Sequence, residues 1–494
     1  MSRVARAALF VSLALLLTAL GLDLINGFPY GLTYDDGYFY AQIAYNLGQS
    51  GRSSFDGFST TSGYHLLWGG LLGLVSAALA PFTASKAAHL YAFEVVFVVL
   101  ALGAAFRFHS RAVERLCVLA LVILGTLLME TMLLSCLLLG LAREEVEIRA
   151  AATEPPWRAL VLSFLVPLAR IDAAVILAVY ALLLFALDRE RRRALQLLAA
   201  LGLGVLAQLA LMQLLFGHPF SVSSMIKLHS AAPFGATLWT SLVGPERIAL
   251  GYVVRAALFV GLAAVVCFLC ISERQLASNR RLLYLGLGAS AFSAIHFVSQ
   301  LMPFWCYLPA YLVLFFALTQ CRLDRPALNR VRGLAVALTA VLGLALAARK
   351  LHIYHTHLDI VRGARDFVAE IQHHVPAGGR IYQIDGSGFT GFFSERSVVD
   401  GDGLVNSYEY ALRMREGRLG GFLDEAQICY VILNRRPDTD RLVDFGGLRV
   451  GSADLEPLLR SATYGRFATT DFALYRRRTP ACALESRSET LNGP

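Results

Sequence analysis

The chain has 494 residues, of which 56% are hydrophobic and only 16% are charged. Soluble domains carry about 25% charged residues, so this composition excludes an ordinary soluble protein and indicates a polytopic α-helical membrane protein. The net charge of +8 does not require nucleic acid as a partner, and none is expected, because Lys and Arg cluster in the stretches between apolar segments. Such clusters are typical of loops that face the cytoplasm.

The apolar segments predict the number of membrane crossings. Arg3 and Arg6 precede the first segment, Ala7–Leu24, which we interpret as a retained helix; the alternative is a cleaved signal peptide. Eleven more segments follow: Leu66–Ala80, Ala87–Phe106, Leu116–Met129, Thr131–Ala142, Ala159–Ala169, Ile171–Leu187, Ala194–Phe216, Leu250–Ile271, Leu282–Phe297, Phe304–Thr319 and Leu334–Ala347. With the N-terminus inside and the C-terminal tail outside, the number of crossings must be odd. Leu66–Ala80 is short, so we expect it not to cross and predict about eleven transmembrane helices.

Five basic stretches lie between these segments and are expected on the cytoplasmic side. They are Arg107–Arg115, Arg143–Arg158, Asp188–Arg193, Ser272–Arg281 and Arg322–Arg332. The polar turns between the other segment ends then share the outer side with the tail. The sequence therefore predicts one polar, outward-facing end that contains any site.

The stretch Thr33–Trp68, just after the first apolar segment, contains the adjacent acids Asp35 and Asp36. Two adjacent carboxylates are costly to place near lipid, so their presence at the membrane edge favours a functional role. We therefore interpret this stretch as an active-site loop. The alternative is a solvated loop with incidental acids. If the loop is extended, the two side chains point to opposite sides and have different roles.

Four further polar residues interrupt or follow apolar segments on the expected outer side. Arg170 and Asp172 form either a structural ion pair or a phosphate-binding guanidinium oriented by a carboxylate. Glu130 has either a helix-packing or a site role. Lys227 is expected on the outer side of the membrane, where lysine is less frequent. It is interpreted either as an anion ligand or as a plain solvated side chain.

The tail differs in its periodicity. We assign residues 1–349 to a transmembrane domain, 350–484 to a soluble α/β domain, and 485–494 to a disordered end. A helix is expected at Asp359–His374, and strands at Arg380–Ile384, Cys429–Leu433 and Phe472–Tyr475. Cys429 and Cys482 are the two cysteines of the tail, and whether they pair stays open.

Two other patterns in the tail receive no site assignment. Gly386–Gly391 matches G-x-G-x-x-G, but no helix is expected after it, so we interpret it as tight turns. His352, His355 and His357 are interpreted as interfacial residues, the alternative being a metal site.

Several motifs resemble those of bacterial GT-C glycosyltransferases that use polyprenyl-phosphate sugars, and are most similar to the terminal arabinofuranosyltransferase type. The motifs are Asp35-Asp36-Gly37-Tyr38, Ala44-Tyr45-Asn46, Gly63-Tyr64-His65-Leu66-Leu67-Trp68, Met129-Glu130-Thr131, Leu168-Ala169-Arg170-Ile171-Asp172, Met225-Ile226-Lys227 and Asp400-Gly401-Asp402-Gly403-Leu404-Val405-Asn406. The sequence departs from the pattern at Ile171, where proline is usual, and at Tyr45, where arginine is common. The donor sugar therefore stays open.

The resemblance implies an inverting transfer of a sugar from a polyprenyl-phosphate donor to a hydroxyl of a glycan, lipid or protein acceptor. It implies that Asp35 and Asp36 are catalytic, with Asp35 as the base. The other expected site residues are Arg170, Lys227 and His65 at the donor phosphate, and Glu130, Asp172 and Tyr38 in support. A divalent metal, Mg²⁺ or Mn²⁺, on Asp36 is a further option.

The implied location is a bacterial inner membrane, with the chain surrounded by lipid and the site on the periplasmic face. The competing function is a lipid-linked sugar transporter or flippase. Transporters tend to have internal repeats, and this sequence shows none.

Overall fold

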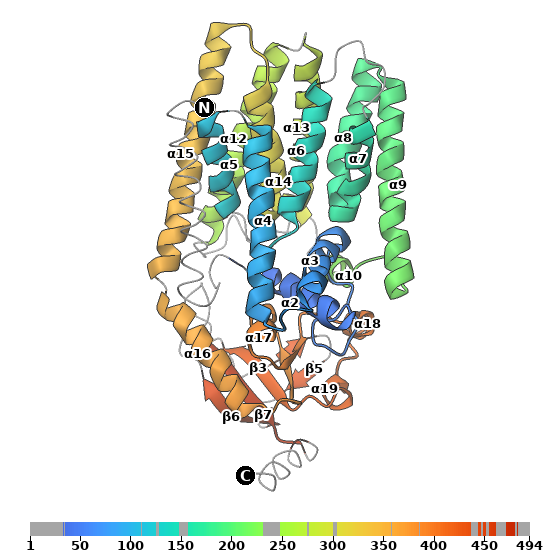
Figure 1. The fold of residues 1–494 in the computed structure, drawn as a ribbon, viewed down its shortest axis with the longest axis vertical. Coiled ribbons are helices and arrows are strands. Elements are labelled where there is room, and N and C mark those ends of the chain that lie inside the picture. Colours follow the sequence, from blue (N-terminus) through green and yellow to red (C-terminus); the bar gives the residue numbers. More distant parts are fainter. Residues whose placement is uncertain are drawn as a thin grey trace.

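A bundle of helices and a mixed β-sheet domain at one end of it make up the chain in the computed structural model (Figure 1). The structure describes residues 33, 35–109, 111–124, 128–147, 157–230, 248–273, 276–299, 304–356, 358–384, 386–435, 443–445, 448–450, 454–460, 471–479 and 482. The first apolar segment, Ala7–Leu24, and His357 lie outside this part of the chain, as do the side chains of His352 and His355.

The helices of the bundle run up and down along the long axis of the molecule (Figure 1). They are α4 (Lys86–Phe108), α5 (Ala112–Leu124), α6 (Thr131–Glu147), α7 (Trp157–Ala169), α8 (Ala174–Leu183), α9 (Arg191–Phe216), α12 (Ile248–Ser272), α13 (Ala277–Ser299), α14 (Phe304–Gln320) and α15 (Pro326–Thr356). A short 3-10 turn, η1 (Ile171–Ala173), precedes α8, and a π-helical turn, η2 (Leu184–Asp188), follows it. Packing pairs α7 with α9, α8 with α13, α6 with α14 and α5 with α15.

The bundle has the composition of a membrane domain. Within the described residues, four helices are long and apolar enough to cross a bilayer: Lys86–Phe108, Ile171–Asp188, Arg191–Phe216 and Pro326–Arg349. Four shorter apolar helices accompany them, at Leu66–Leu79, Trp157–Ala169, Ala257–Ser272 and Cys306–Gln320. The expected total of about eleven crossings stays a prediction.

The described residues of the five basic stretches lie at the end of the bundle opposite the sheet. Arg143 donates to the backbone oxygen of Arg107, and Arg158 lies 3.7 Å from Glu144. Arg281 lies 3.1 Å from Glu190, and Asn279 bonds the backbone of Arg322, just before α15 begins. Because α15 leads from there to the sheet domain, these arginines are separated from that domain by the length of the bundle.

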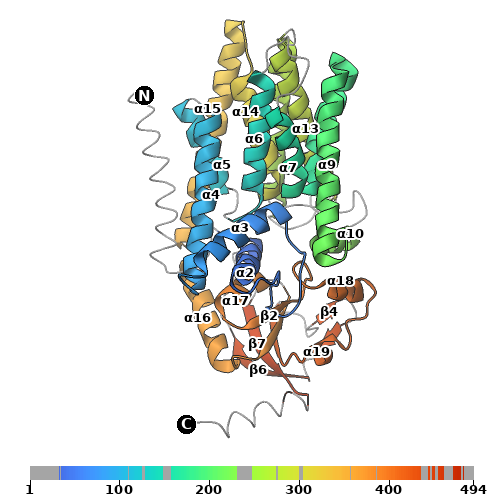
Figure 2. The same ribbon diagram turned by 45° about the vertical axis from the view of Figure 1, so that its right-hand side comes forward.

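Three helices form a layer between the bundle and the sheet (Figure 2). They are α2 (Asp35–Ser50), α3 (Leu66–Leu79) and α10 (Val222–Ser230). Helix α3 has 14 residues and is about 21 Å long, which is shorter than the roughly 30 Å of a bilayer core. It packs against α2, so the short apolar segment lies in the layer that contains the predicted loop.

The C-terminal part is an α/β unit with a five-stranded mixed sheet in the order β2-β1-β3-β7-β6. Its elements are α16 (Leu358–His374), β1 (Arg380–Gln383), α17 (Ser387–Phe393), β2 (Ser397–Asp400), α18 (Tyr408–Arg415), α19 (Phe422–Glu425), β3 (Tyr430–Arg435), β4 (Val443–Phe445), β5 (Leu448–Val450), β6 (Leu455–Arg460) and β7 (Asp471–Arg477). Strand β1 pairs in parallel with β2 and β3, whereas β7 is antiparallel to β3 and β6. Helix α17 connects β1 to β2 and faces α2.

The expectation of turns without a helix at Gly386–Gly391 is wrong, because Ser387–Phe393 forms α17. Gly386 takes a left-handed conformation with φ of 70° immediately before this helix, and its lack of a Cβ permits that start. Helix α15 also continues through residue 350, so the expected domain boundary falls within a helix.

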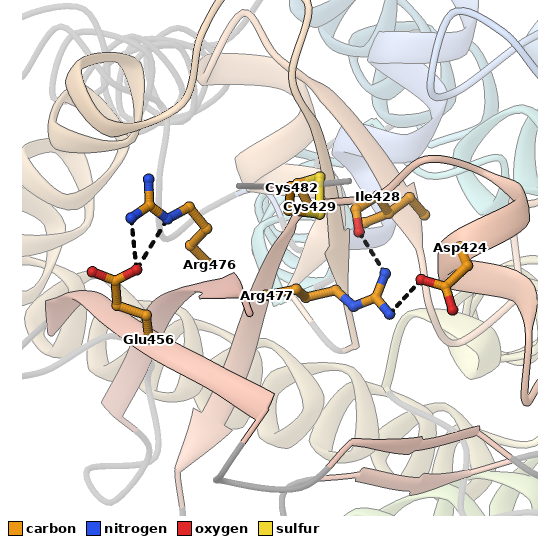
Figure 3. The surroundings of a disulfide bond; sticks show 7 residues. All are labelled: Asp424, Ile428, Cys429, Glu456, Arg476, Arg477 and Cys482. Atoms are coloured by element: carbon orange, nitrogen blue, oxygen red, sulfur yellow. Dashed lines mark hydrogen bonds and ion pairs between the residues drawn. A yellow bond between two sulfur atoms is a disulfide. The ribbon is translucent and has the colours of Figure 1, made fainter. Parts of the chain in front are cut away.

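The two cysteines of the C-terminal part form a disulfide, which connects the residue before β3 to a residue beyond β7 (Figure 3). Arg477 supports the same region, because it donates to the backbone oxygen of Ile428 at 3.0 Å and to Asp424 at 2.7 Å. The question left open by the sequence is thereby answered: Cys429 pairs with Cys482.

Candidate active site

Asp35 and Asp36 lie in the first turn of helix α2. The expectation that they sit on an extended loop with opposed side chains is therefore wrong, and successive residues differ by about 100° around a helix. Acidic residues are favourable at a helix N-terminus, where the backbone N–H groups carry partial positive charge. The two carboxylates still point to different surroundings, although for a helical reason.

Asp35 contacts the C-terminal domain. Its Oδ1 accepts a hydrogen bond from the backbone N–H of Phe389, in the first turn of α17, at 2.8 Å. Tyr38 follows on the same side of the interface: it is fully buried and its ring packs against Phe389, Phe392 and Phe393. The predicted supporting residue Tyr38 thus joins α2 to α17.

Asp36 shares a helix face with Tyr40, because residues four apart lie above one another on a helix. The buried hydroxyl of Tyr40 donates to Glu130 Oε2 at 3.0 Å. The face of α2 that carries Asp36 is therefore turned toward the residues at the start of α6. Sequence reasoning did not select Tyr40, although its i+4 spacing from Asp36 is a signal in a helix.

Glu130, Arg170 and Asp172 form a charged cluster with His296, in which Asp172 is partly exposed and the other three side chains are buried. Arg170 Nη1 donates to Glu130 Oε1 at 2.9 Å. Its Nε and Nη2 donate hydrogen bonds to the carboxylate of Asp172 at 2.8 to 3.1 Å, and His296 Nε2 lies 2.9 Å from Asp172 Oδ2. Arg170 and Glu130 are only 5% and 2% exposed, so their charges need each other for stability.

The predicted ion pair is thus present, and it is larger than the sequence indicated. Two carboxylates fix the plane of the Arg170 guanidinium and engage three of its five N–H groups. His296 was missed by sequence reasoning. The available signal was a histidine close to the end of a strongly apolar segment on the side of the other polar residues.

His65 and Lys227 lie at the edge of this cluster. His65 precedes α3, and its Nε2 is 3.6 Å from Glu130 Oε1. Lys227 is exposed on α10, and it is near enough for its charge to act on both His65 and Cys306. The structure therefore brings His65 and Arg170 together on Glu130, and it places Lys227 on the neighbouring helix α10.

Asp400, at the end of β2, adds a carboxylate on the side of the C-terminal domain. It is 1% exposed and accepts hydrogen bonds from Ser387 Oγ at 2.7 Å and from the backbone N–H of Val405 at 3.1 Å. Burial, with a smaller contribution from the negative charge of Asp36, raises the pKa of Asp400 to about 6 although these hydrogen bonds lower it. In the sequence, Asp400 is marked only as the first residue of the glycine-rich motif Asp400–Asn406.

A divalent metal is expected on Asp36. Across the part of the chain that the structure describes, no group of three or more His, Cys, Asp or Glu side chains is placed to hold a metal ion. A metal on Asp36 would need further ligands from the acceptor, the donor phosphate or water. Mg²⁺ or Mn²⁺ at Asp36 stays a prediction.

Comparisons with known proteins support the fold. No protein-family model matches the sequence, and no curated protein matches it. Among solved structures, the chain is similar to ArnT from Cupriavidus metallidurans bound to undecaprenyl phosphate, with a TM-score of 0.55 and 12% identity over 96% of this chain and 98% of that one. The apo structure of the same protein matches with a TM-score of 0.51 and 12% identity, over 95% and 98% of the two chains.

At this identity the likeness concerns the fold alone, and it extends over nearly the whole of both chains. It supports the predicted GT-C-like helical membrane fold and does not support the narrower arabinofuranosyltransferase type. The chain is a multi-pass membrane protein with an ArnT-like fold.

Proposed function

We propose that the protein is a membrane glycosyltransferase that moves a sugar from a polyprenyl-phosphate donor to an acceptor hydroxyl. The observation that carries this proposal is the placement of carboxylates and cations at one end of the bundle. The Asp36 face of α2 is connected through Tyr40 to the cluster of Glu130 and Arg170. A base for a hydroxyl and cations for a phosphate leaving group are the parts that such a transfer needs.

Two independent lines support the donor class. The motifs resemble glycosyltransferases that use polyprenyl-phosphate sugars, and the matched ArnT structure holds undecaprenyl phosphate. The supported donor is therefore a sugar on a polyprenyl phosphate. An arabinofuranosyl sugar, a glycan, lipid or protein acceptor, and a periplasmic site in the inner membrane belong to the proposal.

The proposed reaction is a single displacement with inversion. The acceptor oxygen attacks the anomeric carbon as the bond from that carbon to the phosphate oxygen breaks. The proton of the acceptor passes to a carboxylate at the start of α2, and the negative charge that develops on the phosphate is stabilised by Lys227, Arg170 and His65 when protonated. Glu130 and Asp172 hold the guanidinium in place.

The test is an assay for free polyprenyl phosphate, with purified protein, a polyprenyl-phosphate sugar and a glycan acceptor. We expect stoichiometric release of the lipid phosphate and glycosylated product, and a loss of about 10²–10⁴-fold in Asp36→Asn if that residue is the base. Movement of intact donor across proteoliposomes without release of lipid phosphate would instead identify a transporter or flippase. The fold comparison does not favour that alternative.

A further inference from the structure

The first turn of α2 is anchored on the C-terminal domain. Besides the hydrogen bond from Phe389 to Asp35, the backbones themselves are in close contact, since a Cβ on Gly388 would lie 2.3 Å from the backbone oxygen of Asp35. Such a distance leaves no room for a side chain at residue 388. The start of α2 and the start of α17 are therefore packed directly on each other.

The same turn of α17 also holds Asp400. Ser387 donates to Asp400 Oδ1 at 2.7 Å, two residues before the N–H that binds Asp35. Asp400 in turn is near enough to Asp36 for their charges to interact. Ser387–Phe389 is thus a short bridge that contacts Asp35 directly and reaches the surroundings of Asp36 through Asp400.

We propose that Asp35 is a positioning residue, through which the Ser387–Phe389 turn of the C-terminal domain sets the place of Asp36, and that Asp36 is the base. This inference rests on the proposed transferase function. It differs from the expectation that Asp35 is the base, and it gives the C-terminal domain a part in the site.

The physical reason is the division of work between the two carboxylates. Asp35 accepts a hydrogen bond from a backbone N–H of the C-terminal domain through one carboxylate oxygen, as a capping side chain does. Asp36 lies on the face that leads to Tyr40 and Glu130. A carboxylate displaced by about 1 Å from its acceptor can lose about 10²-fold in rate, so the anchor matters for turnover.

The first experiment compares Asp35→Asn, Asp35→Ala and Asp36→Asn in the release assay. Asparagine keeps an oxygen that can accept the Phe389 N–H but cannot serve as a base. We expect Asp35→Asn to stay within about tenfold of the unmodified protein, and Asp36→Asn to lose about 10²–10⁴-fold. A loss in Asp35→Asn as large as that in Asp36→Asn, at unchanged melting temperature, would overturn the proposal.

The second experiment uses two glycines of the same helix. Gly388→Ala forces α17 away from the backbone of Asp35, whereas Gly391→Ala, one turn later, meets the Phe55 ring at 2.6 Å. Both substitutions strain the packing of α17, the second against Phe55 in the segment after α2, but only the first is at the acids. We expect kcat to fall at least tenfold more in Gly388→Ala than in Gly391→Ala, with KM for the donor little changed. Equal losses that follow the melting temperatures would refute a positioning role.

A third measurement does not depend on activity. Hydrogen exchange at the Phe389 amide should be as slow in Asp35→Asn as in the unmodified protein and faster in Asp35→Ala. Unchanged exchange in Asp35→Ala would disprove the anchor whatever the reaction is. Slow exchange with the expected pattern, but no release of lipid phosphate by the unmodified protein, would instead reject the transferase function.

Discussion

Replacement of Arg170 by lysine separates the structural and the phosphate-binding roles of the buried cluster. Lysine keeps the charge but not the planar fork that binds Asp172 through Nε and Nη2 while Nη1 binds Glu130. The single ammonium group of lysine cannot hydrogen-bond both Asp172 and Glu130 in this geometry. Arg170→Lys should therefore leave one of the two carboxylates poorly paired.

The magnitude follows from the burial of the partners. Glu130 is 2% exposed, whereas Asp172 is about one-third exposed and keeps His296 as a second partner. Loss of one partner of a buried ion pair costs about 3–5 kcal/mol. Because lysine can keep one contact, we expect the lower part of that range, about 3 kcal/mol, in the free energy of unfolding.

The assay combines unfolding in detergent with donor kinetics, and Lys227→Ala is its partner variant. Lys227 is exposed on α10, so its removal should leave the melting temperature nearly unchanged. If it contacts the donor phosphate, KM for the donor should rise roughly tenfold or more, since a hydrogen bond to a charged group contributes about 1.5–3 kcal/mol. Normal donor kinetics in both variants would refute the phosphate assignment, and normal stability in Arg170→Lys would refute the ion-pair reasoning.

Three other predictions concern the rest of the molecule. The pKa of Asp400 is raised from its ordinary value of 3.8 to about 6, so the folded state binds this proton more tightly than the unfolded chain does. The shift contributes about 3 kcal/mol to the free energy of unfolding below pH 4, and this contribution is lost as the pH rises through 6. Unfolding measured from pH 4 to 7 should show this loss in the unmodified protein and not in Asp400→Asn. Replacement of both disulfide cysteines, 53 residues apart, should cost about 4 kcal/mol in the oxidised protein by the loop-entropy estimate, with reducing agent abolishing the difference. Cysteines at Arg52 and Glu416 should react with an impermeant thiol reagent from the outer side of intact cells, and a cysteine at Arg158 only after the membrane is opened; labelling of all three from one side would contradict the proposed orientation.

The residues that matter were visible in the sequence because charge is rare within apolar segments. Glu130, Arg170 and Asp172 stood out for this reason, and Asp35 and Asp36 did so at the start of the chain. The α/β character of the tail was also predictable from its change in periodicity, and α16 (Leu358–His374) differs from the expected Asp359–His374 by one residue. These signals are local, since they depend on composition and on neighbours within a few turns.

Partners far apart in the sequence were not predictable. Arg170 binds Glu130, which lies 40 residues away in the sequence, and Phe389 donates to Asp35, which lies 354 residues away. His296 and Asp400 entered the site in the same way, because nothing in their neighbouring residues marks their distant partners. A short helix such as α17, with glycines at residues 388 and 391, has weak local propensity and depends on packing against α2.

By itself the sequence determined the membrane class, the polar end of the bundle and the two acids that we place at its centre, because burial of charge and hydrophobic length leave a mark in composition. Only the tertiary structure decided that these acids begin a helix. It also decided that Asp35 faces the C-terminal domain, whereas Asp36 lies on the helix face directed toward the charged cluster. That division comes from the helical offset of about 100° between neighbours together with contacts made across hundreds of residues.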